Sequence, residues 1–252
     1  MRKLLGILML VSGLALAQQG EVRVAVAANF RDAFNDIARA FTKTNPGVRV
    51  VPSFGSSGAF TQQIVNGAPF DLFLAADTSF PRALEAQGLV EPATLRVYAR
   101  GKLVLFVPSR SGLQAKSLEV LRDPRVTRIA IANPETAPYG KAAMQAIKAY
   151  GLYQAVQNRL VFAQDIAQAA QLTLAAADAG LIAYSALFTP AFQGKGSFFI
   201  VPQRLYDPLD QGMVLVKGRA RPEVRAFYEF LQSATAQQII KAYGYQVVPG
   251  AP

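Results

Sequence analysis

The feature that most limits what this chain can fold into is a regular alternation of short apolar strands and amphipathic helices between residues 21 and 88. Strands are predicted at 21–28, 48–52 and 71–75, and each precedes a segment with apolar residues at helical spacing. This order is typical of an open, doubly wound α/β sheet. Ligands bind at the carboxyl ends of the strands in such sheets, so we expect a site at the turns that follow them.

The turn Ser53–Gly58, after the second strand, combines hydroxyl side chains with two glycines. Ser57 is placed to cap the following helix, whose first N–H groups then point outward at the positive end of the helix dipole. Such a turn can bind an anion. A capped strand-to-helix turn is also common in α/β proteins, so this turn alone leaves both interpretations open.

A second turn of the same kind follows the first strand. Asn29 is a favoured N-cap, and Asp32 lies in the first turn of the expected helix, where its charge suits the dipole. If the first two strands are neighbours, the Ala28-Asn29 and Ser56-Ser57 turns face the same crevice. Convergence of two helix N-termini favours an anion site over two unrelated caps.

A second α/β unit begins where the pattern resets, around 98–101. We expect the chain to cross between two lobes there and again near 204–212, which is a hinge geometry. Lobe 1 is predicted to comprise residues 18–99 plus 207–252, and lobe 2 residues 100–206. The remaining elements are predicted as strands at 102–107, 128–132, 160–162, 181–184 and 213–216, and helices near 118–122, at 141–150, from 165 to about 180, at 222–231 and at 234–243.

The segment 1–17 has the pattern of a secretory signal peptide. Two cations, Arg2 and Lys3, precede an apolar run that ends in the small-residue cleavage pattern Ala15-Leu16-Ala17. The run is shorter than the ~20 residues that a membrane span needs, and no lipid-attachment Cys follows it. We therefore expect an exported, soluble, periplasmic protein without an anchor.

The composition argues against most hydrolases. The chain has no Cys, His or Trp, so the commonest nucleophiles, general bases and transition-metal ligands are missing. Paired carboxylates are conceivable from Asp71, Asp77 and Asp165, but a structural role is favoured for Asp71 and Asp77 is most simply a cap; we expect no catalytic residues, no metal site and no cofactor. The net charge of +10 is scattered, which does not favour nucleic-acid binding. This positive charge either raises the local concentration of an anionic ligand or is background without a role in binding.

Several segments, spread in order over nearly the whole chain after the signal, resemble the periplasmic molybdate-binding proteins of ABC transporters. They are Val26–Phe30, Ser53–Gly58, Asn66–Asp77, Ile131–Gly140, Gly151-Leu152 and Ala242–Tyr245. The resemblance implies the type II "Venus flytrap" fold, a periplasmic-binding-protein fold in which two α/β lobes, each with a doubly wound sheet, close on one tetrahedral oxyanion, molybdate or tungstate. It also implies membrane permease subunits as partners and a monomeric protein.

The resemblance further implies that neutral donors bind the oxyanion. Carried over by motif, these are Ala28 and Asn29, Ser56 and Ser57 with the Ser57 hydroxyl, and the backbone N–H groups of Tyr139 and Ile166, with the Tyr139 hydroxyl as a further candidate. Many members have a binding Tyr where this chain has Ala183, with Tyr184 one residue away. The hydroxyl, amide and backbone N–H groups among these residues are hydrogen-bond donors, and an anion that has only acceptor oxygens requires donors.

Other functions stay open at this point. The oxyanion could be another one, such as sulfate. A secreted enzyme that uses Ser57 or a carboxylate is disfavoured by the missing His and Cys. A sensor that signals through a separate protein is a further alternative. Donor-only lining predicts discrimination against hydrogen phosphate, whose O–H would meet no acceptor.

Overall fold

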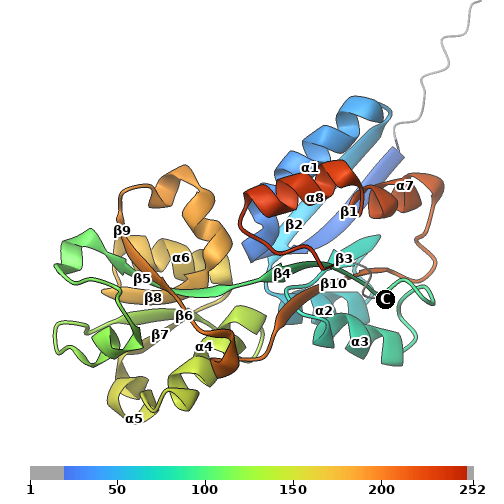
Figure 1. Ribbon diagram of the computed structural model, residues 1–252. Coiled ribbons are helices and arrows are strands. Elements are labelled where there is room, and N and C mark those ends of the chain that lie inside the picture. The colour runs from blue at the N-terminus through green and yellow to red at the C-terminus, as the bar shows by residue number, and fades with distance from the viewer. Residues whose placement is uncertain (1–19, 249–252) are drawn as a thin grey trace, which may run out of the picture.

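The computed structural model describes residues 20–248. The expected signal peptide, residues 1–17, lies outside the described residues. Within them the chain forms two five-stranded sheets with helices on both faces (Figure 1). This confirms the expected two-lobed α/β fold.

The first sheet has the strand order β2-β1-β3-β10-β4. Its strands are β1 (Gly20–Ala27), β2 (Val48–Gly55), β3 (Leu72–Leu74), β4 (Arg96–Gly101) and β10 (Leu209–Leu215). β1 runs parallel to β2 and β3, whereas β10 is antiparallel to β3 and β4. The sequence predicts a crossing around 98–101, whereas the structure has the strand β4 there. β4 is a strand because it pairs with β10, which lies more than 100 residues away, and local sequence does not reveal this pairing.

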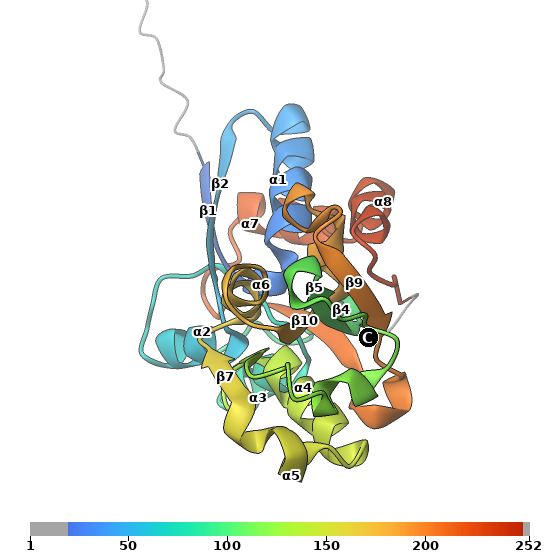
Figure 2. The same ribbon diagram turned by 90° about the vertical axis from the view of Figure 1, so that its left-hand side faces the viewer.

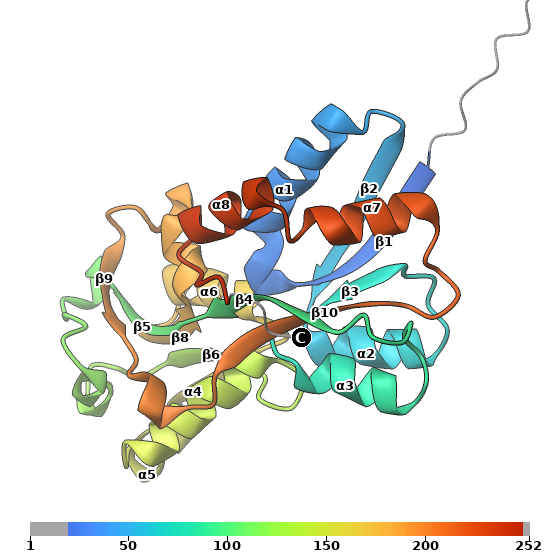
Figure 3. The same cartoon turned by 45° about the vertical axis from the view of Figure 1, so that its right-hand side comes forward.

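Alternate residues of β1 enter two different cores, which explains its buried apolar run. Val24 and Val26 pack with Phe34 of α1 (Arg31–Thr44), while Ala25 packs with Phe60 of α2 (Ser57–Val65). Helices α1, α7 (Pro222–Phe230) and α8 (Ala234–Ala242) cover one face of this sheet, and α2 and α3 (Ser79–Ala86) cover the other (Figure 3).

The second sheet has the order β7-β6-β8-β5-β9, with β7 and β9 at opposite edges (Figure 2). Its strands are β5 (Leu103–Pro108), β6 (Ile129–Ala132), β7 (Leu160–Ala163), β8 (Ala179–Ala183) and β9 (Gly196–Ile200). Helices α4 (Pro138–Ala149) and α6 (Ile166–Ala175) pack on it, and α5 (Tyr153–Val156) follows α4. The helix expected near 118–122 is the 3-10 helix η3 (Leu118–Arg122).

The chain passes between the sheets twice. Only Lys102 separates β4 from β5, and residues 201–208 connect β9 to β10. After α8, a single antiparallel bridge joins Arg100 and Gln246.

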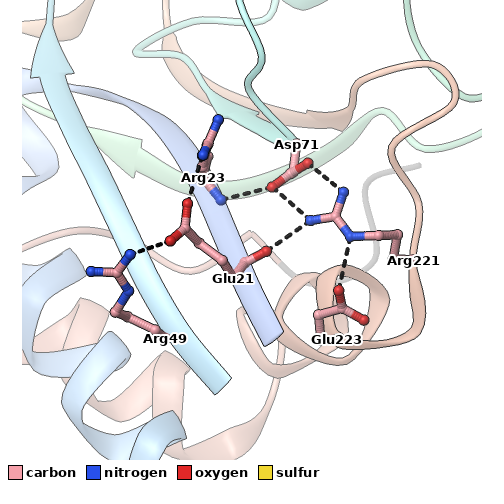
Figure 4. A network of polar contacts seen from close by, with 6 residues as sticks. All are labelled: Glu21, Arg23, Arg49, Asp71, Arg221 and Glu223. Atoms are coloured by element: carbon pink, nitrogen blue, oxygen red, sulfur yellow. Dashed lines mark hydrogen bonds and ion pairs between the residues drawn. The ribbon is translucent and has the colours of Figure 1, made fainter. Parts of the chain in front are cut away.

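The amino ends of the parallel strands in the first sheet are joined by ion pairs (Figure 4). Asp71, which is 2% exposed, accepts the Arg23 N–H at 2.8 Å and both terminal nitrogens of Arg221 at 3.0 and 3.1 Å. Glu21 binds Arg23 and Arg49, and Glu223 binds Arg221. Asp71 thus stabilises the sheet at the end opposite to the turns, which agrees with a structural role.

Candidate functional site

The carboxyl ends of strands from both sheets meet between the lobes. The 3-10 helix η1 (Ala28–Phe30) follows β1, α2 follows β2, α4 follows β6, and α6 follows β7. A cavity of about 270 Å³ opens there between η1 and α6. It is lined by Ala28, Asn29, Arg31, Asp32, Ile166, Ala167, Ala170, Gln171, Ala183, Ser185, Ala186, Thr189, Ala191 and Phe192. Of the predicted site residues, this cavity brings together Ala28, Asn29 and Ile166.

The N-cap of α2 is Ser56, so the prediction that Ser57 caps this helix was wrong. Ser56 has an extended backbone, and its Oγ accepts the Ala59 N–H at 3.3 Å, whereas Ser57 is the first helical residue. The Ser57 side chain is 1% exposed, and its Oγ accepts the Ala76 N–H at 3.0 Å. Among the described residues its hydroxyl proton meets no acceptor, so it can still donate one hydrogen bond.

The N-termini of α2 and α4 lie next to each other across the lobes. The Gly58 N–H donates to the Thr136 carbonyl oxygen at 2.8 Å. A Cβ at position 58 would lie 2.9 Å from Thr136 Cα, closer than such atoms approach, so glycine is needed for this contact. Ser57 and Tyr139 are therefore held close to the same bridge.

Three helix N-termini present backbone N–H groups in this region, that of α6 at the cavity and those of α2 and α4 at the contact between Gly58 and Thr136. The Asp165 side chain caps α6 by accepting the N–H groups of Ala167 and Gln168, both at 2.9 Å. The N–H groups of Ser57, Tyr139 and Ile166 find no acceptor within residues 20–248. These groups and the positive ends of the helix dipoles suit an anion.

The Tyr139 hydroxyl points elsewhere. Its oxygen accepts Gln211 Nε2 at 3.2 Å, and a Cβ on Gly101 would lie 2.0 Å from it. The hydroxyl therefore lies against β4 and β10, and its contact with a ligand stays a prediction. Burial raises the pKa of Tyr139 well above the ordinary value of 10.0, so the phenol stays protonated.

Asn29 does not cap α1, contrary to prediction, because it lies inside η1 and the cap position is Phe30. Its Nδ2 donates to Gln211 Oε1 at 3.0 Å and to the Tyr245 hydroxyl at 2.9 Å. Its carbonyl oxygen accepts Tyr245 Oη at 2.7 Å and Ser185 Oγ at 3.2 Å. Its Oδ1 is buried and has no hydrogen-bond partner in the part of the chain that the structure describes.

Sequence reasoning missed the polar residues that surround Asn29. Gln211 on β10 is fully buried, and Tyr98 on β4, Tyr245 after α8 and Ser185 after β8 are each less than 9% exposed. Burial raises the pKa of Tyr98 and Tyr245 well above 10.0. The available signal was Gln211 itself, a lone amide in a segment that is otherwise mostly apolar.

Ala183 lines the cavity, whereas Tyr184 lies away from it. The Tyr184 ring packs against Phe188 with centroids 5.0 Å apart and under the Lys102 ammonium at 5.8 Å. The chain thus has a methyl side chain where many members of the resembled family have a phenol.

The charged residues that line the cavity are Arg31 and Asp32. Arg31 and Asp32 lie on its rim with opposite charges, and the Arg31 guanidinium stacks over Phe54 at 4.3 Å. Within residues 20–248, no group of His, Cys, Asp or Glu side chains could hold a metal ion. In the same part of the chain, every helix is too short or too polar to cross a membrane.

The sequence matches a family of known binding proteins. The model of the family described as "Bacterial extracellular solute-binding protein" matches residues 22–246. The molybdate-binding protein ModA of Azotobacter vinelandii is 42% identical over 231 residues, 91% of each chain. ModA of Rhodobacter capsulatus is 40% identical over 243 residues, 94% of this chain and 93% of the relative.

Solved structures agree with this assignment. The periplasmic molybdate-binding protein of Azotobacter vinelandii superposes with a TM-score of 0.81 at 35% identity, over 91% of this chain and all of that one. The sulfate-binding protein SubI of Mycobacterium tuberculosis has a TM-score of 0.78 at 16% identity, over 91% of this chain and 88% of that one, which shows the shared fold alone. The chain belongs to the bacterial extracellular solute-binding protein family.

Proposed function

We propose that the protein captures a tetrahedral oxyanion, molybdate or tungstate, between its two lobes and delivers it to the permease of an ABC transporter. The observation that carries the proposal is the set of N–H groups at the N-termini of α2, α4 and α6 that have no acceptor within residues 20–248, together with the buried Ser57 hydroxyl. The names of the relatives from Azotobacter and Rhodobacter support molybdate as the ligand.

The proposed binding groups are those of Ala28, Asn29, Ser56, Ser57, Tyr139 and Ile166. Tyr139 and Ile166 contribute backbone N–H groups, Ser57 contributes its hydroxyl, and Ser56 orients α2 through its cap. Hydrogen bonds to a charged partner contribute about 1.5–3 kcal/mol each. About six of them suffice for sub-micromolar affinity after the cost of association.

Delivery requires a protein that opens and closes. We propose that lobe 1 (18–99 plus 207–252) and lobe 2 (100–206) move about the two crossings, with the contact between Gly58 and Thr136 formed on closure. The closed form then presents the permease with a surface that the open form lacks. The protein acts as a monomer in the periplasm after removal of residues 1–17, and it has no catalytic role.

Thermal unfolding with molybdate, tungstate, sulfate and phosphate tests the proposal. A ligand that binds only the native state stabilises it by RT ln(1 + [L]/Kd), about 2.7 kcal/mol at 100 times Kd. We expect a clear rise in Tm with molybdate and tungstate and little with phosphate. A rise with sulfate alone would assign the protein to sulfate, and no rise with molybdate or tungstate would reject the proposal.

A further inference from the structure

The carboxamide of Gln211 lies at the centre of the buried polar network between the lobes. One of its ends is 3.0 Å from both the Tyr98 hydroxyl and the Asn29 amide, and the other is 3.2 Å from the Tyr139 hydroxyl. Gln211 has no exposed surface, so water cannot satisfy its hydrogen-bonding groups. The donors and acceptors of Gln211 must therefore find their partners among its neighbours.

With Gln211 Oε1 toward Asn29, the protons do not match the acceptors. Asn29 Oδ1 has no donor, and Gln211 Nε2 carries two hydrogens but contacts only the Tyr139 oxygen. The Tyr139 proton meets no acceptor among the described residues. The single Tyr98 proton faces two acceptors, Gln211 Oε1 at 3.0 Å and the Ala75 carbonyl oxygen at 3.1 Å.

A half-turn of the Gln211 and Asn29 carboxamides gives the protons of the network suitable acceptors. The half-turn exchanges nitrogen and oxygen in each group and moves no other heavy atom. Gln211 Nε2 then donates one hydrogen to the Tyr98 oxygen and the other to Asn29 Oδ1. Tyr98 donates its proton to Ala75, and Tyr139 donates to Gln211 Oε1. The Asn29 NH2 group then takes the buried position of the present Oδ1, which has no partner within residues 20–248, in a residue that lines the cavity.

The hydrogen-bond contacts of Tyr245 are compatible with the same orientation of the Asn29 amide. Its hydroxyl lies 2.7 Å from the Asn29 carbonyl oxygen and 2.9 Å from the Asn29 side-chain amide. Its proton can be shared between the two Asn29 oxygens in a three-centre bond. Ser185 Oγ, 3.2 Å from the Asn29 carbonyl, supplies a second proton.

We propose that Gln211 is a positioning residue that holds the Asn29 amide with its NH2 group toward the cleft. The inference rests on the proposed function, because a fully deprotonated oxyanion requires donors. Asn29 then offers two N–H groups to the ligand, whereas the opposite orientation would offer it a repelling oxygen. Gly101 leaves the space for this arrangement, since a Cβ there would lie 2.0 Å from Tyr139 Oη and 2.9 Å from Gln211 Nε2.

The first test needs no ligand. In a nuclear Overhauser spectrum of the protein, the side-chain amide protons of Gln211 should show cross-peaks to the ring protons of Tyr98. Cross-peaks to Tyr139 in place of Tyr98 would overturn the proposal. Tyr98→Phe and Tyr139→Phe assign the two sets of ring signals.

The second test is the affinity of Gln211→Glu for molybdate, measured by calorimetry. Whether ionised or protonated, the carboxyl group carries at most one hydrogen where the carboxamide carries two, so it cannot donate to both Tyr98 and Asn29 Oδ1, and it holds the Asn29 amide less firmly with its NH2 group toward the cleft. We expect affinity to fall roughly tenfold to 150-fold, as for loss of a hydrogen bond to a charged group. Gln157→Glu, an exposed change of the same charge before the amino end of β7, should leave affinity unchanged.

A double-mutant cycle separates positioning from a general loss of structure. Asn29→Ala removes the group that Gln211 orients, so adding Gln211→Glu to it should change affinity less than twofold. Equal effects of Gln211→Glu with and without Asn29 would contradict the proposal. If the unaltered protein binds no oxyanion, the proposed function fails, and the cross-peaks of Gln211 still decide the orientation. They decide it as well if Gln211→Glu does not fold.

Discussion

The Gly58 N–H and the Thr136 carbonyl oxygen form a 2.8 Å hydrogen bond that joins the N-terminus of α2 to the loop before α4. The bond connects the two lobes where their helix N-termini converge. Its geometry leaves no space for a side chain at position 58, because Thr136 Cα lies 2.9 Å from where a Cβ would be. This contact is therefore a direct probe of closure.

Gly58→Ala should weaken molybdate binding about tenfold, because the new methyl group pushes the lobes apart and lengthens the hydrogen bonds to the anion. Calorimetry measures the affinity. Gly47→Ala is a matched control, since a Cβ there meets nothing within 4 Å. Unchanged affinity in Gly58→Ala would mean that this contact is not part of the bound state.

Ser57→Ala should weaken binding by about 1–3 kcal/mol, the cost of leaving one anion oxygen unmatched. Molybdate titrations of the two forms measure this difference. If affinity is the same, the Ser57 hydroxyl does not reach the ligand.

Ser56→Ala tests the cap of α2. Loss of a Ser N-cap lowers stability by about 0.5–2 kcal/mol, and denaturant unfolding measures it. Ser233→Ala is the control, because Ser233 caps α8 in the same way through Ala236 N–H at 3.2 Å. Both variants should lose similar stability, and only Ser56→Ala should also lose affinity; equal affinity in the two would place α2 outside the site.

Stability should fall with rising pH above about 10. Burial raises the pKa of Tyr98, Tyr139 and Tyr245 above the ordinary value of 10.0, and it raises that of Tyr228 to about 12. The unfolded chain loses these phenolic protons first, so the stabilisation is complete below pH 10 and is lost as pH rises toward the folded values. Urea midpoints from pH 7 to 11.5 measure the change, and Tyr98→Phe should flatten it. A constant midpoint across this range would contradict the burial of these phenols.

Arg221→Met should lower stability by about 2 kcal/mol, because it removes two hydrogen bonds to the buried Asp71 carboxylate. Molybdate affinity should not change, since the pair lies at the opposite end of the sheet from the cleft. Arg125→Met breaks an exposed pair with Asp123 and should cost less than about 1 kcal/mol. Equal losses in the two variants would argue against a special role for Asp71.

Local patterns were enough to predict most of the strands and helices and the turns at Ala28-Asn29 and Ser56-Ser57. They failed at β4, whose strand state depends on pairing with the distant β10. They also misplaced the cap of α2 by one residue, because Ser56 and Ser57 are equally good caps and packing decides between them. The network of Gln211, Tyr98 and Tyr245 could not be predicted, since its members are joined only by the fold.

The most direct test of oxyanion capture is an isothermal titration of the purified protein with molybdate at pH 7. We expect one molybdate per chain with a sub-micromolar Kd, and binding of phosphate that is far weaker. Absence of heat with both molybdate and tungstate, or phosphate binding as tight as molybdate binding, would contradict the account.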